Sequence, residues 1–241
     1  MTCRAFPLIC AHTGSGAAPD NTRASFLESI AMRADVAEVD LRVTEDGKVI
    51  LLHDHSPLLA ELTLEQLNRP ENRVKLSQVY ESHTITTLDE VLGLAREYGI
   101  KLNLDIKTKA VIEPAIRSIR NFEMEELVFI TGCSDDITNR HRGIKVLYNT
   151  PDVLTEQEEL DYIGWARIVC EWANVGGYYG LNLNYRTCRS ELVEYAHRLG
   201  LAVWVYTVDD RESLIEMIHL GVDEITTNEV NLLKQLKLET G

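Results

Sequence analysis

Several features that are common in other classes of protein are missing from this sequence. No apolar run approaches the ~18 residues of a membrane-spanning helix. The N-terminal residues lack the long apolar segment and the small-residue cleavage site of a secretory signal. The five cysteines are scattered and include no CxxC pair. A disulfide framework or a zinc site is therefore not expected, and reduced thiols favour a cytoplasmic location.

Positive charge is also scarce. The chain has 24 lysines and arginines against 38 aspartates and glutamates, so its formal net charge is −14. Such a chain is repelled by nucleic acid and by anionic lipid, and neither nucleic acid nor a stable membrane association is predicted. The 241 residues are 45% hydrophobic, which is enough for one large core. No linker or low-complexity tract divides them, so residues 1–241 are predicted to form a single domain, and the sequence does not indicate an oligomeric state.

Segments of strand and helix character alternate along the chain and define the predicted fold. This alternation implies parallel strands joined by right-handed crossovers, hence an α/β protein. Eight units of about 30 residues favour a closed (β/α)8 TIM barrel, with a doubly wound open sheet as the second choice. The eight predicted strands are Phe6–Ala11, Val36–Leu41, Lys101–Ile106, Leu127–Thr131, Ile144–Tyr148, Tyr179–Leu183, Leu201–Thr207 and Val222–Thr226.

Three connecting segments carry more specific predictions. Residues 56–86 are expected to form a small insertion after the second strand, irregular except for a short helix at Leu62–Leu67. Asp135–His141 is predicted as one helix, and Glu156–Trp172 as one longer helix.

The stretch from Val36 to Asp54 carries the first chemical signal. Glu38 and Asp40 lie two residues apart on a predicted strand, so their side chains point to the same face. Two carboxylates on one face repel each other and are costly to bury unless a cation neutralises them. Because Mg²⁺ and Ca²⁺ prefer carboxylate oxygens, one of these two ions is the predicted cofactor. An exposed sheet edge is the alternative explanation of such a pair.

A predicted hairpin brings an imidazole to the same place. Asp46-Gly47 is a strong hairpin signal, and the apolar run Val49–Leu52 follows it. The returning strand delivers His53 beside the two carboxylates.

The barrel prediction gathers further polar residues, because active sites of such barrels lie at the C-terminal ends of the strands. His12 follows the first predicted strand, and Asp105 and Lys107 lie at the end of the third. Trp204 and Tyr206 share one face of the seventh strand. Core packing and a platform for an alcohol group both remain open for this pair.

These motifs, in this order and spacing, resemble the glycerophosphodiester phosphodiesterase family. The resemblance runs over nearly the whole chain, and each motif alone is weak. The segments that carry it are His12-x-Gly14, Pro19-Asp20-Asn21-Thr22, Glu38-Val39-Asp40, Asp46-Gly47, His53-Asp54, Leu104-Asp105-Ile106-Lys107, Val203–Val208 and Gly221–Asn228.

Carried over residue by residue, the resemblance implies a set of roles. It implies three ligands for one Mg²⁺ or Ca²⁺, an acid/base pair, and a cation that faces the phosphate. The residues concerned are Glu38, Asp40 and Asp105 as ligands, His12 and His53 as the acid/base pair, and Lys107 at the phosphate.

The sequence departs from the family pattern at several of these positions. Thr13 stands where the family has a phosphate-contacting arginine, and Asp20 and Asp105 replace glutamates. The arginine usually found shortly after the His-Asp motif is missing. Losing an arginine removes a bidentate clamp on phosphate. Arg42 and Arg23 are candidates to replace it.

The predicted function is metal-dependent hydrolysis of a small-molecule glycerophosphodiester to glycerol 3-phosphate and an alcohol. One histidine would deprotonate the attacking hydroxyl, and the other would protonate the leaving alkoxide. The candidate substrate contacts are Lys107, Trp204, Arg42 and Thr13. Two alternatives stay open: a phospholipase D-like enzyme of the sphingomyelinase D type, and a degenerate, non-catalytic barrel that binds a ligand.

Overall fold

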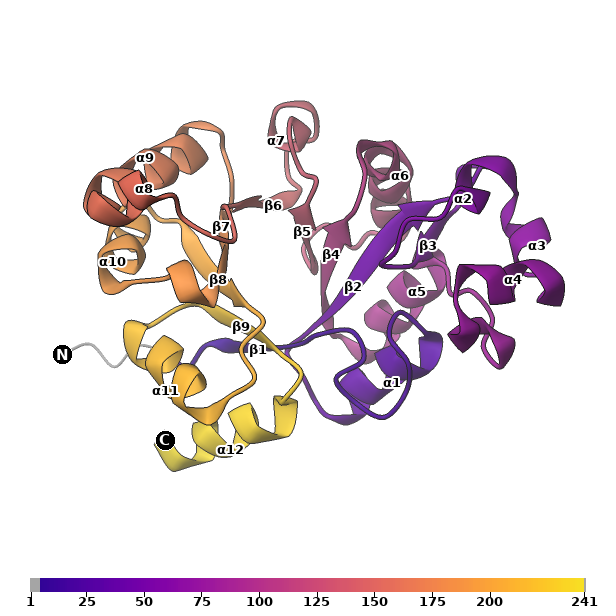
Figure 1. Cartoon of the computed structure of the whole chain (residues 1–241), viewed down its shortest axis with the longest axis horizontal. Helices are drawn as coiled ribbons and strands as arrows, with labels where there is room; N and C mark the ends of the chain where they lie inside the picture. The colour runs from indigo at the N-terminus through magenta and orange to yellow at the C-terminus, as the bar shows by residue number, and fades with distance from the viewer. Residues whose placement is uncertain (1–4, 241) are drawn as a thin grey trace.

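Eight parallel strands close into a barrel in the computed structural model, which describes residues 5–240 (Figure 1). Each strand pairs with its neighbours in parallel, and β1 pairs with both β9 and β2, so the sheet has no open side. The predicted (β/α)8 barrel is confirmed, and the open-sheet alternative is wrong. The strands are β1 Leu8–Ala11, β2 Val36–Val43, β4 Lys101–Ile106, β5 Val128–Gly132, β6 Lys145–Asn149, β7 Gly180–Asn184, β8 Ala202–Tyr206 and β9 Glu224–Thr227.

Helices cover the outside of the barrel (Figure 1). Side chains alternate along each strand. Apolar residues such as Val39 and Leu104 pack in the clusters against these helices, whereas the alternate residues, such as Glu38 and Asn103, face the barrel axis. The helices are α1 Arg23–Ala31, α5 Leu88–Tyr98, α6 Ile112–Asn121, α7 Ile137–Arg140, α8 Glu156–Leu160, α9 Tyr162–Val175, α10 Ser190–Arg198, α11 Arg211–Leu220 and α12 Val230–Thr240, with short 3-10 turns at Lys109–Val111 and Tyr185–Thr187.

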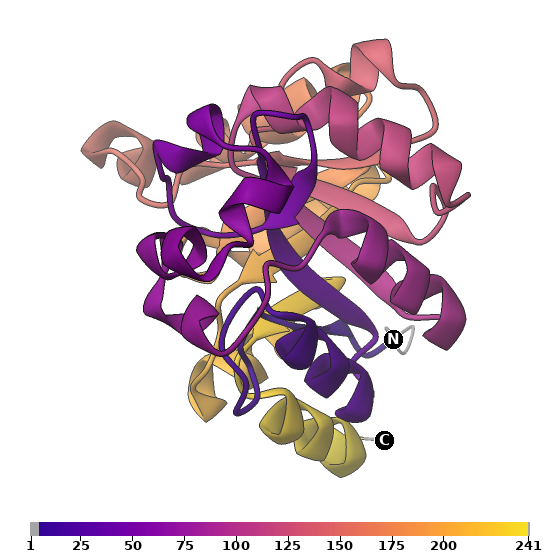
Figure 2. The same cartoon turned by 90° about the vertical axis from the view of Figure 1, so that its right-hand side faces the viewer.

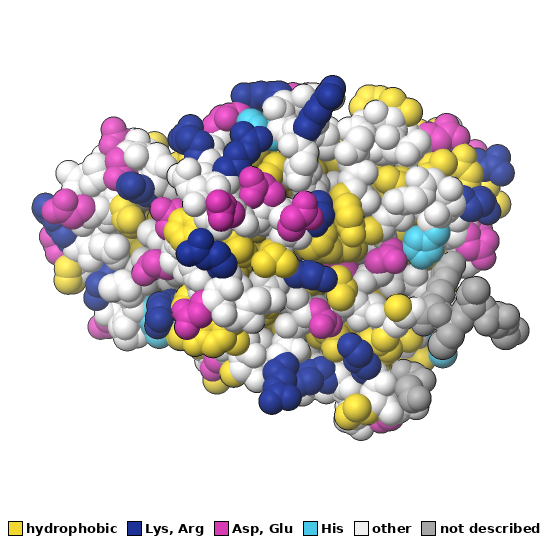
Figure 3. Space-filling model, turned by 180° about the vertical axis from the view of Figure 1, so that it is seen from behind, with side chains coloured by type: hydrophobic (Ala, Val, Ile, Leu, Met, Phe, Trp, Pro, Cys, Tyr) yellow, Lys and Arg dark blue, Asp and Glu magenta, His cyan; other side chains and the backbone are white. Residues whose placement is uncertain are grey.

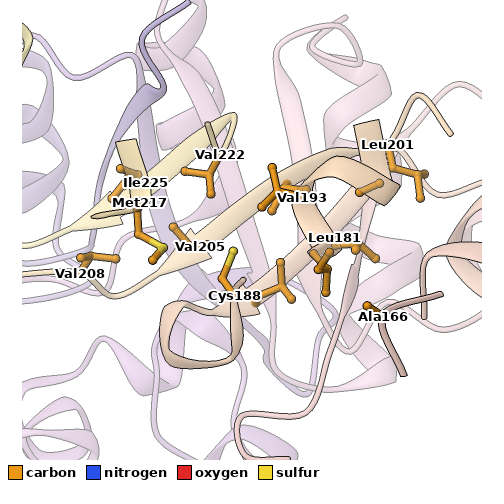
Figure 4. Packing of buried hydrophobic residues seen from close by; sticks show 14 of the residues in the cluster. Ala166, Leu181, Cys188, Val193, Leu201, Val205, Val208, Met217, Val222 and Ile225 are labelled. Carbon is orange, nitrogen blue, oxygen red and sulfur yellow. The ribbon is translucent and has the colours of Figure 1, made fainter. Parts of the chain in front are cut away.

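Two large apolar clusters lie between strands and helices. In one of them Leu181 and Val205 of the sheet pack with Val193 of α10 (Figure 4). Inside the barrel a smaller cluster consists of Phe129, Leu147 and Trp204. This inner cluster packs inside the barrel below the carboxyl ends of the strands. The polar side chains at the carboxyl ends therefore lie over a layer of apolar side chains.

The insertion after the second barrel strand is more regular than predicted. Strand β3, Val49–Leu51, returns antiparallel to β2 and is followed by short helices rather than by irregular chain. These helices lie together at one side of the barrel (Figures 1 and 2). They are α2 Leu58–Glu61, α3 Leu64–Leu67, α4 Pro70–Leu76 and the 3-10 turn Gln78–Glu81.

Two predicted helices differ from the observed ones. Glu156–Trp172 is not one helix, because Asp161 leaves helical geometry and its carboxylate caps the amide of Gly164 at 3.1 Å, which starts α9 anew. Asp135–His141 contains only the single turn α7, because Asp136 has a left-handed backbone, φ 66°, that a helix cannot contain.

At least one face of the molecule is mixed in charge despite the negative total. Figure 3 shows basic and acidic side chains interspersed over the face that lies behind the view of Figure 1. None of the helices in residues 5–240 combines the length and apolar character of a membrane span. Cys3 lies outside the described residues, and the other four cysteines, Cys10, Cys133, Cys170 and Cys188, are free thiols.

Candidate active site

Three carboxylates meet at the carboxyl end of β2 and β4. Glu38 and Asp40 project from β2, and the parallel register places Asp105 of β4 directly beside Asp40. One oxygen from each of the three lies within 4.8 Å of the others. Only 6% of Glu38 and 3% of Asp40 is exposed, so water does little to relieve their repulsion.

Burial and mutual repulsion shift the pKa values of groups in this cluster. Desolvation of Glu38, with the charges of Asp40 and Asp105, raises the pKa of its carboxyl well above the ordinary value. Lys107 lies against the same cluster, with Nζ 2.6 Å from both an Asp40 oxygen and an Asp105 oxygen. Burial alone would lower the pKa of the Lys107 ammonium, but the charges of Asp105 and Asp40 outweigh that effect and raise it.

The donor set fits a hard divalent cation. The second oxygen of Asp105, Oδ1, is buried and has no hydrogen-bond partner. A buried carboxylate oxygen left unpaired is costly, and a cation bound there would satisfy it. Gly132 allows this carboxylate to sit where it does, because a Cβ at that position would come within 2.0 Å of Oδ1.

The loop after β1 holds the carboxylates in place. The amide of Thr13 donates to Glu38 at 3.1 Å. Asn21 makes two bonds to Asp40: its Nδ2 donates to the carboxylate at 2.7 Å, and its Oδ1 accepts from the Asp40 amide at 3.0 Å. Thr13 itself is buried, and its hydroxyl accepts from the amide of Asn21 at 2.7 Å. The threonine therefore supports the cluster and does not face the cavity.

His12 leaves β1 at the same end of the barrel. Its Nδ1 lies 3.0 Å from Oδ1 of Asn228, which follows β9. This contact joins the first and last strands of the closed barrel above the point where they pair.

His53 comes from the chain after β3. Its Nδ1 lies 2.9 Å from the carboxylate of Asp54, and both side chains are largely exposed. Arg42 donates from Nε and Nη2 to the backbone carbonyl of His53 at 2.9 and 2.7 Å. The Arg42 guanidinium thus holds the segment that carries His53, and Arg42 does not line the cavity.

One cavity of about 350 Å³ brings most of these groups together. Its size suits a small molecule. Lining residues named by the sequence analysis are His12, Glu38, Asp40, His53, Asp105 and Lys107.

Tyr206, which the sequence analysis considered together with Trp204, lines the cavity and donates its hydroxyl to Asp152 at 2.8 Å. Trp204 does not line it, because this side chain is 1% exposed and packs in the inner cluster one layer deeper. Of the two explanations for Trp204, core packing is the one that the structure supports.

Asn21 and Asp152 were missed as site residues. Asn21 appeared only within the motif Pro19-Asp20-Asn21-Thr22, which gave it no role of its own. In the structure Thr22 is the N-cap of α1 and Asn21 takes a left-handed backbone, φ 57°. Asp152 lies in the loop after β6, where no motif marked it. The barrel prediction is the one signal that could have found it, since such loops form the site face.

Ionisable side chains gathered at the carboxyl end of a closed (β/α)8 barrel place this protein among the barrel enzymes. The sequence model of the glycerophosphoryl diester phosphodiesterase family matches residues 12–232. The chain belongs to this family and is a phosphoric diester hydrolase.

The matches to individual relatives cover almost the whole length of both chains. A glycerophosphodiester phosphodiesterase of Caldanaerobacter subterraneus subsp. tengcongensis is 27% identical over 252 residues, which cover 97% of this chain and 99% of the relative. The crystal structure of a glycerophosphodiester phosphodiesterase from Parabacteroides distasonis superimposes with a TM-score of 0.79 at 18% identity, covering 98% and 99% of the two chains. A phosphodiesterase of Oleispira antarctica, solved with the product sn-glycerol-3-phosphate, gives a TM-score of 0.74 at 20% identity, covering 95% and 96%.

Proposed function

We propose that this protein hydrolyses glycerophosphodiesters to glycerol 3-phosphate and an alcohol, with a divalent cation and two histidines. The observation that carries the proposal is the shared lining of one cavity by three converging carboxylates and two imidazoles. The relative from Oleispira antarctica holds sn-glycerol-3-phosphate as its product, and this supports the same product here.

Glu38, Asp40 and Asp105 would hold the cation. All three supply oxygen, the donor that Mg²⁺ and Ca²⁺ prefer, and both ions remain candidates. When bound, such an ion neutralises a nonbridging phosphate oxygen and lowers the pKa of a neighbouring hydroxyl. An aspartate at position 105 reaches less far than a glutamate. The parallel register of β2 and β4 sets it beside Asp40, and Gly132 on the other neighbouring strand leaves room for its Oδ1.

His12 and His53 would move the protons. One imidazole takes the proton from the attacking hydroxyl, and the other delivers a proton to the departing alkoxide. Imidazole suits both tasks, because it can accept a proton at one ring nitrogen and donate one from the other. The attacking hydroxyl is water or an alcohol of the substrate next to the phosphate.

Lys107 is the side chain that would meet the phosphate. It lines the cavity, and its positive charge is maintained by the two neighbouring aspartates. Thr13 and Arg42, the other candidate phosphate contacts, are engaged with the protein itself, so we assign them to support of Glu38 and of the His53 segment.

The two alternative functions are less well supported. A non-catalytic barrel would have no reason to keep three carboxylates and two histidines on one cavity. A sphingomyelinase D type of enzyme would use a similar residue set, but the matching family and the named relatives are glycerophosphodiester phosphodiesterases. We further propose that the chain works as one domain in the cytoplasm, in keeping with the free thiols at the four described cysteines.

Turnover of glycerophosphocholine, glycerophosphoethanolamine and glycerophosphoinositol by the wild type, His12→Ala and His53→Ala tests the proposal. General acid–base catalysis contributes about 10²–10⁴-fold, so each variant should lose turnover by about that factor while remaining folded. Wild-type turnover in either variant would remove that histidine from the mechanism.

A further inference from the structure

The ring of His12 is held by a residue from the far end of the chain. Its Nδ1 meets Oδ1 of Asn228 at 3.0 Å. A ring nitrogen and an amide oxygen can form a hydrogen bond in only one sense, because the amide oxygen has no proton to give. The identity of that amide atom therefore decides which nitrogen of His12 carries the proton.

The orientation of the Asn228 amide is fixed by Asp209, which follows β8. Nδ2 of Asn228 donates to Oδ2 of Asp209 at 2.8 Å, and the backbone amide of Asn228 donates to Oδ1 at 2.8 Å. The hydroxyl of Thr227 also donates to Oδ1, at 3.3 Å. A carboxylate only accepts, so Asn228 must turn its NH₂ to Asp209 and its oxygen to His12.

We propose that Asn228 and Asp209 are positioning residues that hold His12 as the Nδ1–H tautomer. Nδ1 then carries the proton toward Asn228, and Nε2 keeps its lone pair. Since Nδ1 is occupied, Nε2 is the nitrogen that remains for the substrate in the cavity that His12 lines. The assignment rests on the proposed role of His12 in proton transfer.

The second histidine also meets an acceptor through Nδ1, but in a pair that is largely exposed to solvent. His53 pairs with its own chain neighbour Asp54, and 66% of the His53 side chain and 86% of that of Asp54 is exposed. His12 is instead linked through Asn228, which follows β9, to the carboxylate of Asp209, which follows β8. Residues at the ends of two adjacent strands therefore fix the orientation and the tautomer of its ring. Fixing the tautomer in this way is what a second group does for a catalytic histidine in other hydrolases.

The isosteric variant Asp209→Asn tests the assignment. An asparagine at 209 has one accepting oxygen for the two N–H groups of Asn228, so the Asn228 amide is released to flip and present NH₂ to His12. The double variant Asp209→Asn with Asn228→Asp exchanges the two groups. A carboxylate at 228 then accepts from Nδ1–H of His12 and from the amide at 209, and the original tautomer returns.

The tautomer is read by nitrogen NMR of histidine-labelled protein at a pH where the ring is neutral, with the His12 signals assigned by their loss in His12→Gln. We expect Nδ1–H in the wild type, a substantial Nε2–H population in Asp209→Asn, and Nδ1–H again in the exchanged double variant. The matched control is Asp210→Asn, since Asp210 is the next residue and caps α11 at Ser213 without contacting Asn228.

Kinetics give the second readout. Asp209→Asn should lower kcat by about 10–100-fold with KM changed less than about twofold, because proton transfer and not binding is impaired. The exchanged variant should recover most of kcat, and Asp210→Asn should match the wild type.

A wild-type tautomer and kcat in Asp209→Asn, or an exchanged variant no better than the single one, would overturn the proposal. If no glycerophosphodiester is turned over by the wild type, the proposed function fails, and the NMR result still decides the tautomer.

Discussion

Nζ of Lys107 lies 2.6 Å from Oδ1 of Asp40, one of the three carboxylates of the acidic cluster. The same nitrogen lies 2.6 Å from Asp105, so one ammonium partly neutralises two carboxylates that are also the proposed cation ligands. The lysine and a divalent cation are thus two sources of positive charge for one buried site. Without the lysine, the folded state should therefore depend more strongly on a bound divalent cation for its stability.

Lys107→Met should therefore destabilise the cation-free protein strongly. Removing one partner of a buried ion pair costs about 3–5 kcal/mol, because the remaining charge is left uncompensated. Urea unfolding in EDTA and in saturating Ca²⁺ should show a larger gain from the cation in Lys107→Met than in the wild type. Lys109→Met is the matched control, because Lys109 makes only an exposed ion pair with Asp135 at 3.4 Å. Equal losses in the two variants would contradict this account.

Asn21→Gly should weaken cation binding. Asn21 fixes Asp40 through two hydrogen bonds, and residues that orient a ligand in this way are typically worth about 10–100-fold in metal affinity. Glycine keeps the left-handed backbone of position 21, φ 57°, so only the side-chain bonds are lost. Calorimetric titration of Ca²⁺ measures the effect. Asn121→Gly, at the exposed end of α6, should leave the affinity unchanged, and an unaltered affinity in Asn21→Gly would rule out the supporting role.

Glu224 should make stability fall as the pH rises. This carboxyl on β9 is fully buried, and desolvation raises its pKa to about 8, although bonds from Cys10 and Thr226 oppose the shift. A group with a raised pKa in the folded state stabilises fully below its unfolded pKa, and that stability is lost as the pH rises through the folded pKa. The loss should begin near pH 4.5 and reach roughly 5 kcal/mol at most above pH 8, at about 1.4 kcal/mol per pKa unit.

Urea unfolding of the wild type and Glu224→Gln at pH 5, 7 and 9 in EDTA measures this term. The neutral glutamine should flatten the dependence. Glu38, whose pKa is also raised by burial, acts in the same direction in both proteins, so the difference between them isolates Glu224. Parallel pH curves would show that Glu224 does not titrate as described.

The barrel and the acidic cluster were predictable because both follow from periodicity. Strand–helix alternation gave the closed fold, and the two-residue spacing of Glu38 and Asp40 gave their common face. Asp105 was expected nearby because it ends the adjacent barrel strand, and its role as a ligand was implied by the family resemblance. The register that sets it directly beside Asp40 is seen only in the structure.

Depth within the barrel and contacts between distant segments were not predictable in this way. Alternation places Trp204 and Tyr206 on one face, but it does not say that Trp204 fills the inner core while Tyr206 reaches the cavity. Arg42 shares the face of Glu38, yet the antiparallel β3 brings the His53 carbonyl within its reach. The bond from His12 to Asn228 joins residues 216 positions apart, and only the closure of the barrel brings them together.

The cation dependence of glycerophosphodiester hydrolysis tests the central claim most directly. EDTA-treated wild type should be inactive toward glycerophosphocholine, and added Mg²⁺ or Ca²⁺ should restore turnover. Asp105→Asn, which removes one of the three converging charges, should need at least about 10-fold more cation for half of its maximal rate. Full turnover in EDTA, or the same cation requirement in Asp105→Asn as in the wild type, would contradict the claim that these three carboxylates hold the ion on which the reaction depends.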